Sequence, residues 1–188
     1  MNLRSRRLVR PARTLAGVGL AATLLATVAG SAGYAADGRP RPVDVPAVLR
    51  PPAGQVLSAD FAAAGVQVYG CADGAWTFTE PAANLLGWVR RRPGAATAVH
   101  FRGPSWESTD DGSLVEATVV ASSPVPGSVP ELLLRATRNR GDGVFGRVGY
   151  VQRLHARGGT APTGSCPAGA TTGVPYRAEY RFYVPAGS

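Results

Sequence analysis

The sequence contains no lysine, so all twenty of its basic residues are arginines. It also contains no Gly-x-Ser-x-Gly pentapeptide. A lysine base and the nucleophile turn of the serine hydrolases are therefore both absent, and the common serine-hydrolase arrangements find no support in this chain.

Cysteine and histidine are scarce, with two residues of each. Cys71 and Cys166 lack the close Cys-x-x-Cys spacing of a metal site, and the two histidines, His100 and His155, lie far apart. The segment 141–146 spells Gly-x-Gly-x-x-Gly, but a strand-like run follows it where a dinucleotide site needs a helix. We interpret 141–146 as a hairpin turn and expect no metal and no cofactor.

Long helical periods, internal repeats and heptads are also missing.

Residues 1–13 carry five arginines and no acid, residues 15–30 are apolar or small, and a run of small residues follows at 31–36. This order is typical of a secretory signal peptide, 1–36, cleaved after Ala35 or Ala36. The apolar run is shorter than the roughly 20 residues of a membrane-spanning helix, which argues against a retained anchor.

Removal of residues 1–36 takes away five arginines and no acid, so the net charge falls from +8 to fifteen minus twelve, or +3. That charge gives no indication of nucleic-acid binding. The expectation is a secreted monomer with an unknown extracellular ligand and no membrane span once the signal is removed. In an oxidising compartment, Cys71 and Cys166 are expected to form a disulfide.

The remaining chain divides into a proline-rich arm, 37–54, and one domain, 55–188. Period-two alternation predicts a hairpin, 65–71 and 75–80, around an Asp-Gly turn. It also predicts four further strands: 95–101, 113–122, 144–157 and 174–183. We expect one helical turn at 81–86, started by Pro81, and leave the apolar run 132–137 unassigned. The pattern favours an all-β, mainly antiparallel domain with Gly/Pro-rich loops, either a β-sandwich or a barrel.

The stretch 100–113 concentrates the polar chemistry of the chain. Glu107 is close enough in sequence to Asp110 or Asp111 for paired-carboxylate acid/base catalysis, with His100 assisting. Trp106 offers a flat apolar face on which a sugar ring would stack. Arg102, Gln152 and Arg153 are further ligand-binding candidates. The alternative is structural: Trp106 would belong to the core, and 110–113 would form a turn with Asx hydrogen bonds.

Several ordered blocks carry a family resemblance: Gly65-Val66-Gln67-Val68-Tyr69-Gly70-Cys71, then His100 to Ser113, then Tyr150-Val151-Gln152-Arg153-Leu154 to Cys166, and Val174-Pro175-Tyr176-Arg177-Ala178-Glu179-Tyr180. Over about 55–184 the chain resembles the domain of unknown function 3455 family of secreted proteins. It departs from the family at Glu131, where Trp is usual, and at His155-Ala156, where Asn-Thr is expected. The resemblance implies a single secreted domain with the 100–113 stretch as a signature, and it implies no activity.

Three functions remain open at this point. The first is a secreted domain that binds an extracellular or cell-surface ligand such as a polysaccharide. The second is a hydrolase-type enzyme that uses Glu107 with Asp110 or Asp111 and His100. The third is a structural extracellular protein without a small ligand.

Overall fold

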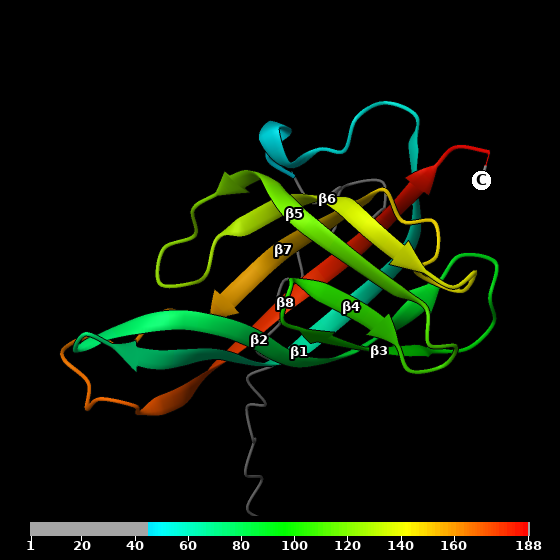
Figure 1. Cartoon of the computed structure of the whole chain (residues 1–188). Coiled ribbons are helices and arrows are strands. Elements are labelled where there is room, and N and C mark those ends of the chain that lie inside the picture. Colours follow the sequence, from blue (N-terminus) through cyan, green and yellow to red (C-terminus); the bar gives the residue numbers. More distant parts are fainter. Residues whose placement is uncertain (1–44, 188) are drawn as a thin grey trace, which may run out of the picture. The chain divides into compact units, whose positions relative to one another are not determined.

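The computed structural model describes residues 45–187. The predicted signal peptide, 1–36, and residues 37–44 of the proline-rich arm lie outside the described residues. Within the described part, eight antiparallel strands form one closed barrel, and the only helix is a short 3-10 turn (Figure 1). The elements are η1 (Ala47–Leu49), β1 (Gln55–Ala72), β2 (Ala75–Val89), β3 (Ala96–Phe101), β4 (Ser105–Ser108), β5 (Leu114–Ser123), β6 (Glu131–Arg140), β7 (Tyr150–Gly158) and β8 (Thr171–Pro185).

Each strand pairs with the strands before and after it in sequence, and β1 also pairs with β8. That last pairing closes the sheet, so an edge is unpaired only where a strand extends beyond its neighbour, as at residues 75–82 of β2. The prediction of an all-β, antiparallel domain is confirmed, and of the two architectures left open the structure has the barrel.

β8 illustrates how the sequence alternation builds the wall. Tyr176, Ala178, Tyr180 and Phe182 face the interior and are buried, and the charged residues between them face outward. Burying a side chain of the size of Phe182 stabilises the fold by about 1.5–3 kcal/mol. The predicted strand 174–183 is therefore confirmed, and its actual bounds are wider.

Two predicted elements differ from the structure. The helical turn at 81–86 is wrong, because β2 continues through it and pairs with β1, Pro81 lying opposite Gln67. Proline is tolerated there because β3 pairs with β2 only from Ala83 onward, which leaves one side of Pro81 without a strand partner. The predicted strand 144–157 begins only at Tyr150, and the six residues before it form a loop.

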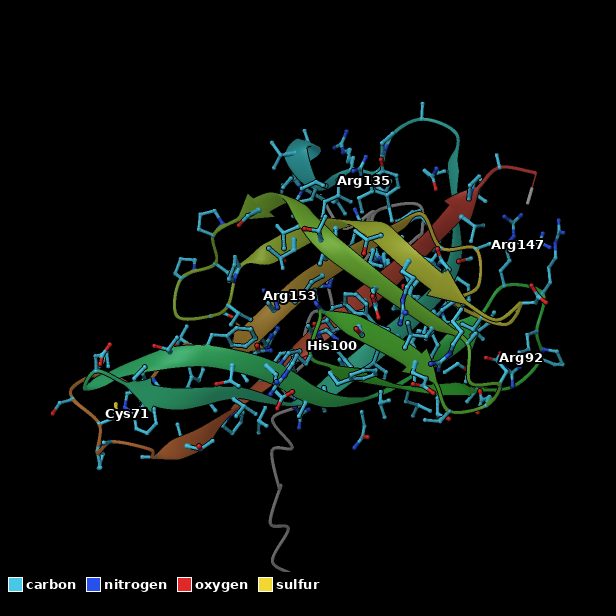
Figure 2. All side chains as sticks on the ribbon, viewed as in Figure 1. Cys71, Arg92, His100, Arg135, Arg147 and Arg153 are labelled. Atoms are coloured by element: carbon cyan, nitrogen blue, oxygen red, sulfur yellow. A yellow bond between two sulfur atoms is a disulfide. The ribbon has the colours of Figure 1, made fainter. Side chains whose placement is uncertain are left out.

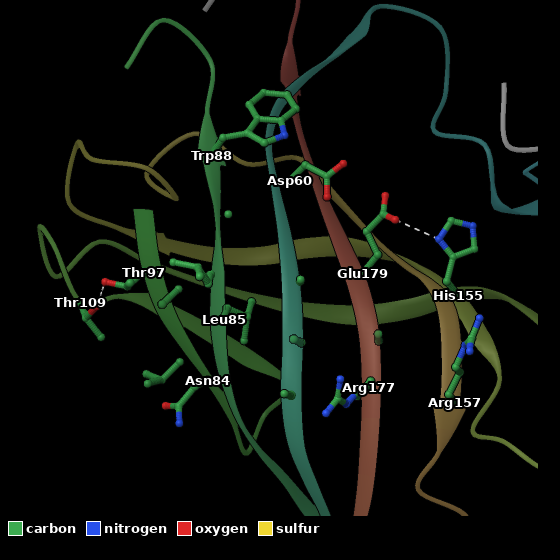
Figure 3. A pocket seen from close by; sticks show the side chains of 18 residues that line it. Asp60, Asn84, Leu85, Trp88, Thr97, Thr109, His155, Arg157, Arg177 and Glu179 are labelled. Carbon is green, nitrogen blue, oxygen red and sulfur yellow. Dashed lines mark hydrogen bonds and ion pairs between the residues drawn. The ribbon is translucent and has the colours of Figure 1, made fainter. Parts of the chain in front are cut away.

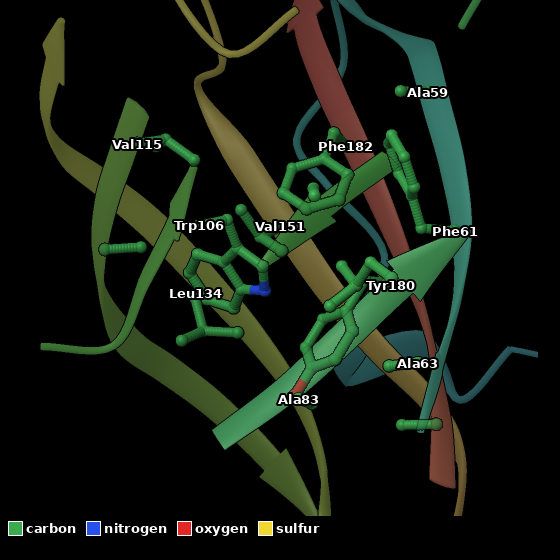
Figure 4. Close-up of a cluster of buried hydrophobic side chains, with 14 of the residues drawn as sticks. Ala59, Phe61, Ala63, Ala83, Trp106, Val115, Leu134, Val151, Tyr180 and Phe182 are labelled. Atoms are coloured by element: carbon green, nitrogen blue, oxygen red, sulfur yellow. The ribbon is translucent and has the colours of Figure 1, made fainter. Parts of the chain in front are cut away.

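That loop brings Phe145 into the barrel core. Phe145 is fully buried, with its ring centroid 4.5 Å from that of Phe182, and Phe61 packs against both rings. Trp106 joins this cluster at 5.9 Å from Phe182 (Figure 4). Aromatic side chains thus fill one part of the barrel completely, and Trp106 marks where the filled part ends.

The predicted disulfide between Cys71 and Cys166 is confirmed, with the two Cα atoms 5.7 Å apart. It joins the end of β1 to the loop between β7 and β8, at the tip of the long β1–β2 hairpin (Figure 2). Within residues 45–187, no helix has the length and apolar character of a membrane span.

Candidate binding cavity in the barrel

A cavity of about 520 Å³ lies inside the barrel beyond the aromatic core. Its mouth is bordered by Phe78 and Thr79 on β2, the β3–β4 turn, Val119 on β5, and Val129 and Pro130 before β6. Cavities of roughly 300–1,000 Å³ are the usual size of small-molecule sites, and an eight-stranded barrel is just wide enough to hold one small ligand.

The β1 wall of the cavity reverses the usual arrangement of polar and apolar residues. Gln67 and Tyr69 are buried and line the cavity, while Val66 and Val68 at the alternate positions are only partly buried. A strand that turns an amide and a phenol inward, in place of its valines, is typical of a wall around a polar space rather than of a packed core. The Tyr69 hydroxyl donates a hydrogen bond to the Gly159 carbonyl at 2.6 Å.

His100 and Trp106 form one end of the cavity. Their rings are parallel, with centroids 4.4 Å apart, and Tyr180 packs edge-on against both. Burial lowers the pKa of His100 to about 3, although the hydrogen bond between Nδ1 and the Ser105 carbonyl opposes this shift. The ring is therefore neutral with its proton on Nδ1, and Nε2 keeps a lone pair that no other described residue engages.

Tyr180 and Tyr176 continue the polar wall on β8. Their hydroxyl oxygens are 3.5 Å apart, and burial raises the pKa of both phenols. The Arg153 guanidinium, from β7, opposes the shift at both phenols. Both hydroxyls are therefore protonated at neutral pH, and one of them donates to the other.

Two buried nitrogen donors of the wall have no hydrogen-bond acceptor within 3.5 Å among the described residues, although the Tyr176 hydroxyl lies near enough to the Gln67 amide for that amide to lower the pKa of Tyr176. They are Nε1 of Trp106 and Nε2 of Gln67, and the two side chains are 0% and 2% exposed. His100 stacks face to face on the indole, and the Tyr180 ring packs against it with centroids 5.4 Å apart, where an aromatic ring is at best a weak acceptor. An unsatisfied buried donor costs about 1–3 kcal/mol, so each such group in a native structure calls for an explanation.

Arg153 faces the cavity because it lies two positions after Val151 on β7, and Val151 is buried in the core. Arg153 lies opposite Leu132 and Tyr180, which also face inward. The register then shifts at His155, whose φ is +51°, so that Ala156 turns into the core and His155 stays outside. Figure 2 labels Arg153 and His100 in the same region of the barrel.

Of the other two predicted ligand-binding residues, one lies at the mouth of the cavity and one lies on the outside of the barrel. Arg102 borders the mouth of the cavity, and its Nε lies 3.1 Å from a carboxylate oxygen of Glu80. Gln152 faces away from the cavity, donating to the Leu49 carbonyl of η1 and accepting a hydrogen bond from Tyr183 at 2.7 Å. Gln152 thus fastens the N-terminal turn to the outside of the barrel.

The carboxylates proposed for catalysis do not meet His100. Glu107 sits between the inward-facing Trp106 and Ser108 on β4, and it pairs with Arg140 at 3.0 Å. Asp110 accepts hydrogen bonds from the Thr97 backbone and hydroxyl, which hold its pKa below the usual value.

Asp111 accepts hydrogen bonds from the backbone and hydroxyl of Ser113 and from the backbone of Val144. Desolvation would raise the pKa of Asp111, but these hydrogen bonds outweigh it and the pKa is lowered. A carboxyl group that stays ionised to low pH is a poor general acid. The contacts of Asp111 are those of a turn that anchors the β6–β7 loop.

Comparison with protein families gives one match. Residues 89–184 match the model of the family described as Protein of unknown function (DUF3455). The chain belongs to this family. No curated protein and no solved structure matches it.

In this DUF3455 member, the matched region runs from the last residue of β2 almost to the end of β8. It contains the cavity residues His100 and Trp106 of the stacked pair, Arg153 on β7 and Tyr180 on β8. The β1 wall, with Gln67 and Tyr69, precedes the match.

A second, more open depression of about 1080 Å³ lies on the outer face of β1, β2, β3, β7 and β8 (Figure 3). Small residues form its floor, Trp88 is 46% exposed on its rim, and His155 bonds Glu179 there at 2.9 Å. His155 and His100 therefore lie on opposite sides of the barrel wall. Among residues 45–187, no three His, Cys, Asp or Glu side chains group as a metal site would require.

Sequence analysis missed the three residues Gln67, Tyr69 and Tyr180 as cavity residues. The alternation of 174–183 does assign Tyr180 to the buried face, but a buried tyrosine is ordinarily a core residue. For β1 the signal is the inverted order of polar and apolar residues, which is recognisable only once the inward face is known.

Proposed function

We propose that this protein is a binding protein that takes up one small, mainly apolar molecule inside its barrel. The observation that carries the proposal is the pair of orphaned buried donors, Trp106 Nε1 and Gln67 Nε2, in the wall of a cavity of about 520 Å³. A ligand with hydrogen-bond acceptors would satisfy both donors, and its apolar body would fill the rest of the space.

The chemistry of the lining supports binding rather than catalysis. The cavity lining includes no carboxylate, serine or cysteine side chain. His100 donates its Nδ1 proton to a backbone carbonyl and is neutral, and no carboxylate of the lining orients it. The hydrolase hypothesis depends on Glu107 and Asp110 or Asp111, whose partners are arginine, threonine and serine.

The burial of Trp106 also bears on the kind of ligand. A polysaccharide on the protein surface needs an exposed aromatic face, whereas Trp106 is 0% exposed and is covered on one face by His100. We therefore favour a small molecule that enters the barrel over an extended polymer. The Cys71–Cys166 disulfide supports placing this binding function outside the cytoplasm.

The proposal is tested with aminoanthracene, a neutral apolar dye whose fluorescence rises in an apolar site. Leu132 lines the cavity opposite Arg153, so Leu132→Trp fills the space that the ligand would occupy. We expect the full chain to bind the dye and Leu132→Trp to weaken binding by at least about tenfold, since a filled cavity leaves no room for the dye.

Leu86→Trp is the matched control, because Leu86 is 60% exposed on the outer face and lines the external depression. It should leave dye affinity unchanged. Thermal unfolding of both variants shows that the fold is retained. Absence of dye binding to the wild-type chain, or loss of affinity in Leu86→Trp alone, contradicts the proposal.

A further inference from the structure

Arg153 is a cation in the cavity without an anionic partner. Arg102 at the mouth, and Arg140 and Arg181 outside the cavity, each lie within 4.0 Å of a carboxylate. No Asp or Glu among residues 45–187 pairs with Arg153. Its Nε donates a hydrogen bond to the Pro130 carbonyl at 3.0 Å, and its guanidinium also interacts with the Tyr180 hydroxyl.

The position of this guanidinium is interior, not peripheral. Its charge acts on four groups of the cavity region at once, disfavouring protonated His100 and favouring ionised Tyr69, Tyr176 and Tyr180. A guanidinium carries five N–H donors in a rigid fork that fits the two oxygens of a carboxylate. No carboxylate among residues 45–187 engages that fork, and a cation that is partly withdrawn from water gains from an anionic partner.

The rest of the cavity fits the remainder of such a molecule. Trp106 Nε1 and Gln67 Nε2 supply two further donors toward an anionic group. Toward the mouth the lining becomes apolar, and Phe78 and Val119 there are 52% and 48% exposed. Polar donors inside and apolar side chains at the opening match an amphipathic molecule that enters head first.

We infer that the ligand is a small amphipathic carboxylate, whose head group binds Arg153 and whose apolar part extends toward Phe78 and Val119. This inference rests on the proposed function, since it names the chemical class of the molecule that the cavity holds. A monoanion is favoured over a phosphate dianion by charge balance, because His100 is neutral and the charge of Arg102 is matched by Glu80.

The test compares ligands that differ only in their head group. Decanoate, decanol, decylamine and decyl phosphate compete with aminoanthracene for the full chain at neutral pH. We expect decanoate to bind at least about tenfold more tightly than decanol, because a hydrogen bond to a charged group contributes about 1.5–3 kcal/mol. Decylamine should bind more weakly than decanol, and decyl phosphate more weakly than decanoate.

Arg153→Met removes the charge and keeps most of the side-chain volume. It should bind decanoate and decanol equally, and Arg153→Lys should retain part of the preference for decanoate. Arg135→Met is the matched control, because Arg135 is exposed on β6, and it should behave as the wild type does.

The outcomes separate this inference from the proposed function. If aminoanthracene binds but decanol competes as well as decanoate, the cavity binds ligands and the carboxylate inference is wrong. A preference for decanoate that survives in Arg153→Met also overturns it, and so does a dye-binding chain from which decanoate displaces nothing. If the dye itself does not bind, the proposed function fails.

Discussion

His100 is a histidine that the folded chain keeps neutral. Burial lowers its pKa from 6.5 to about 3. Between these values the unfolded chain binds a proton that the folded chain does not. The contribution of His100 to stability is therefore complete above about pH 6.5 and is lost as the pH falls toward 3.

In the His100→Gln variant, the free energy of unfolding should fall less on acidification, because glutamine can donate to the Ser105 carbonyl and does not titrate. The loss of unfolding free energy between pH 7 and pH 4 should be smaller in the variant by roughly 2 kcal/mol or more. Urea unfolding at both pH values measures it. His155→Gln, on the outer face, is the control; an unchanged acid sensitivity in His100→Gln would show that His100 is not held neutral.

Neighbouring residues show how far a site can be predicted from sequence. Arg153 and Gln152 were both candidates for ligand binding, but adjacent strand residues point to opposite faces, so at most one of them faces the cavity. To decide which one, it is necessary to know which alternate residues of β7 face the interior. The bulge at His155 changes that set partway along the strand. The sequence contains no signal for the bulge beyond an unusual His-Ala pair.

At the scale of elements, the turn at Asp111 holds the loop that carries Phe145 into the core. The Asp111 carboxylate receives three hydrogen bonds, and Ser113 Oγ in turn accepts one from the backbone N–H of Phe145. Asp111→Ala should therefore lower the unfolding free energy by at least about 1 kcal/mol while dye affinity stays unchanged.

Chemical denaturation and dye titration of the same variant measure both quantities. Asp142→Ala, an exposed acid in the loop itself, is the matched control and should be neutral in both. A loss of binding in Asp111→Ala without a loss of stability would instead support a functional role for this carboxylate.

Several strands could be predicted from the local sequence, but the segment 81–86 of β2 could not. Residues 174–183 have a polar-apolar period of two that no helix shares, so β8 was identified correctly. At 81–86 the Pro-Ala-Ala-Asn-Leu-Leu run satisfies the rules for a helix start, and only pairing with β1 makes it a strand. At 81–86 the pairing with β1 outweighs the local preference for a helix, and the local sequence contains no information about that pairing.

For the molecule as a whole, the β-rich class follows from the sequence, whereas closure does not. Closure depends on β1 meeting β8, for instance Phe61 opposite Tyr180, across most of the described chain. The disulfide was predictable because two cysteines allow one pairing. The cavity was not predictable. It forms where inward-facing residues of several strands leave space between them, and the sequence of any one strand gives no indication of that space.

The three tryptophans provide the most direct test of the central claim, that the ligand binds inside the barrel. In a nitrogen-labelled chain each gives its own indole N–H resonance, assigned with Trp76→Phe and Trp88→Phe. Trp106 lines the cavity, and Trp88 lies in the outer depression. On titration with aminoanthracene we predict a large shift of the Trp106 resonance and none of Trp88; a shift of Trp88 with Trp106 unchanged would contradict the account.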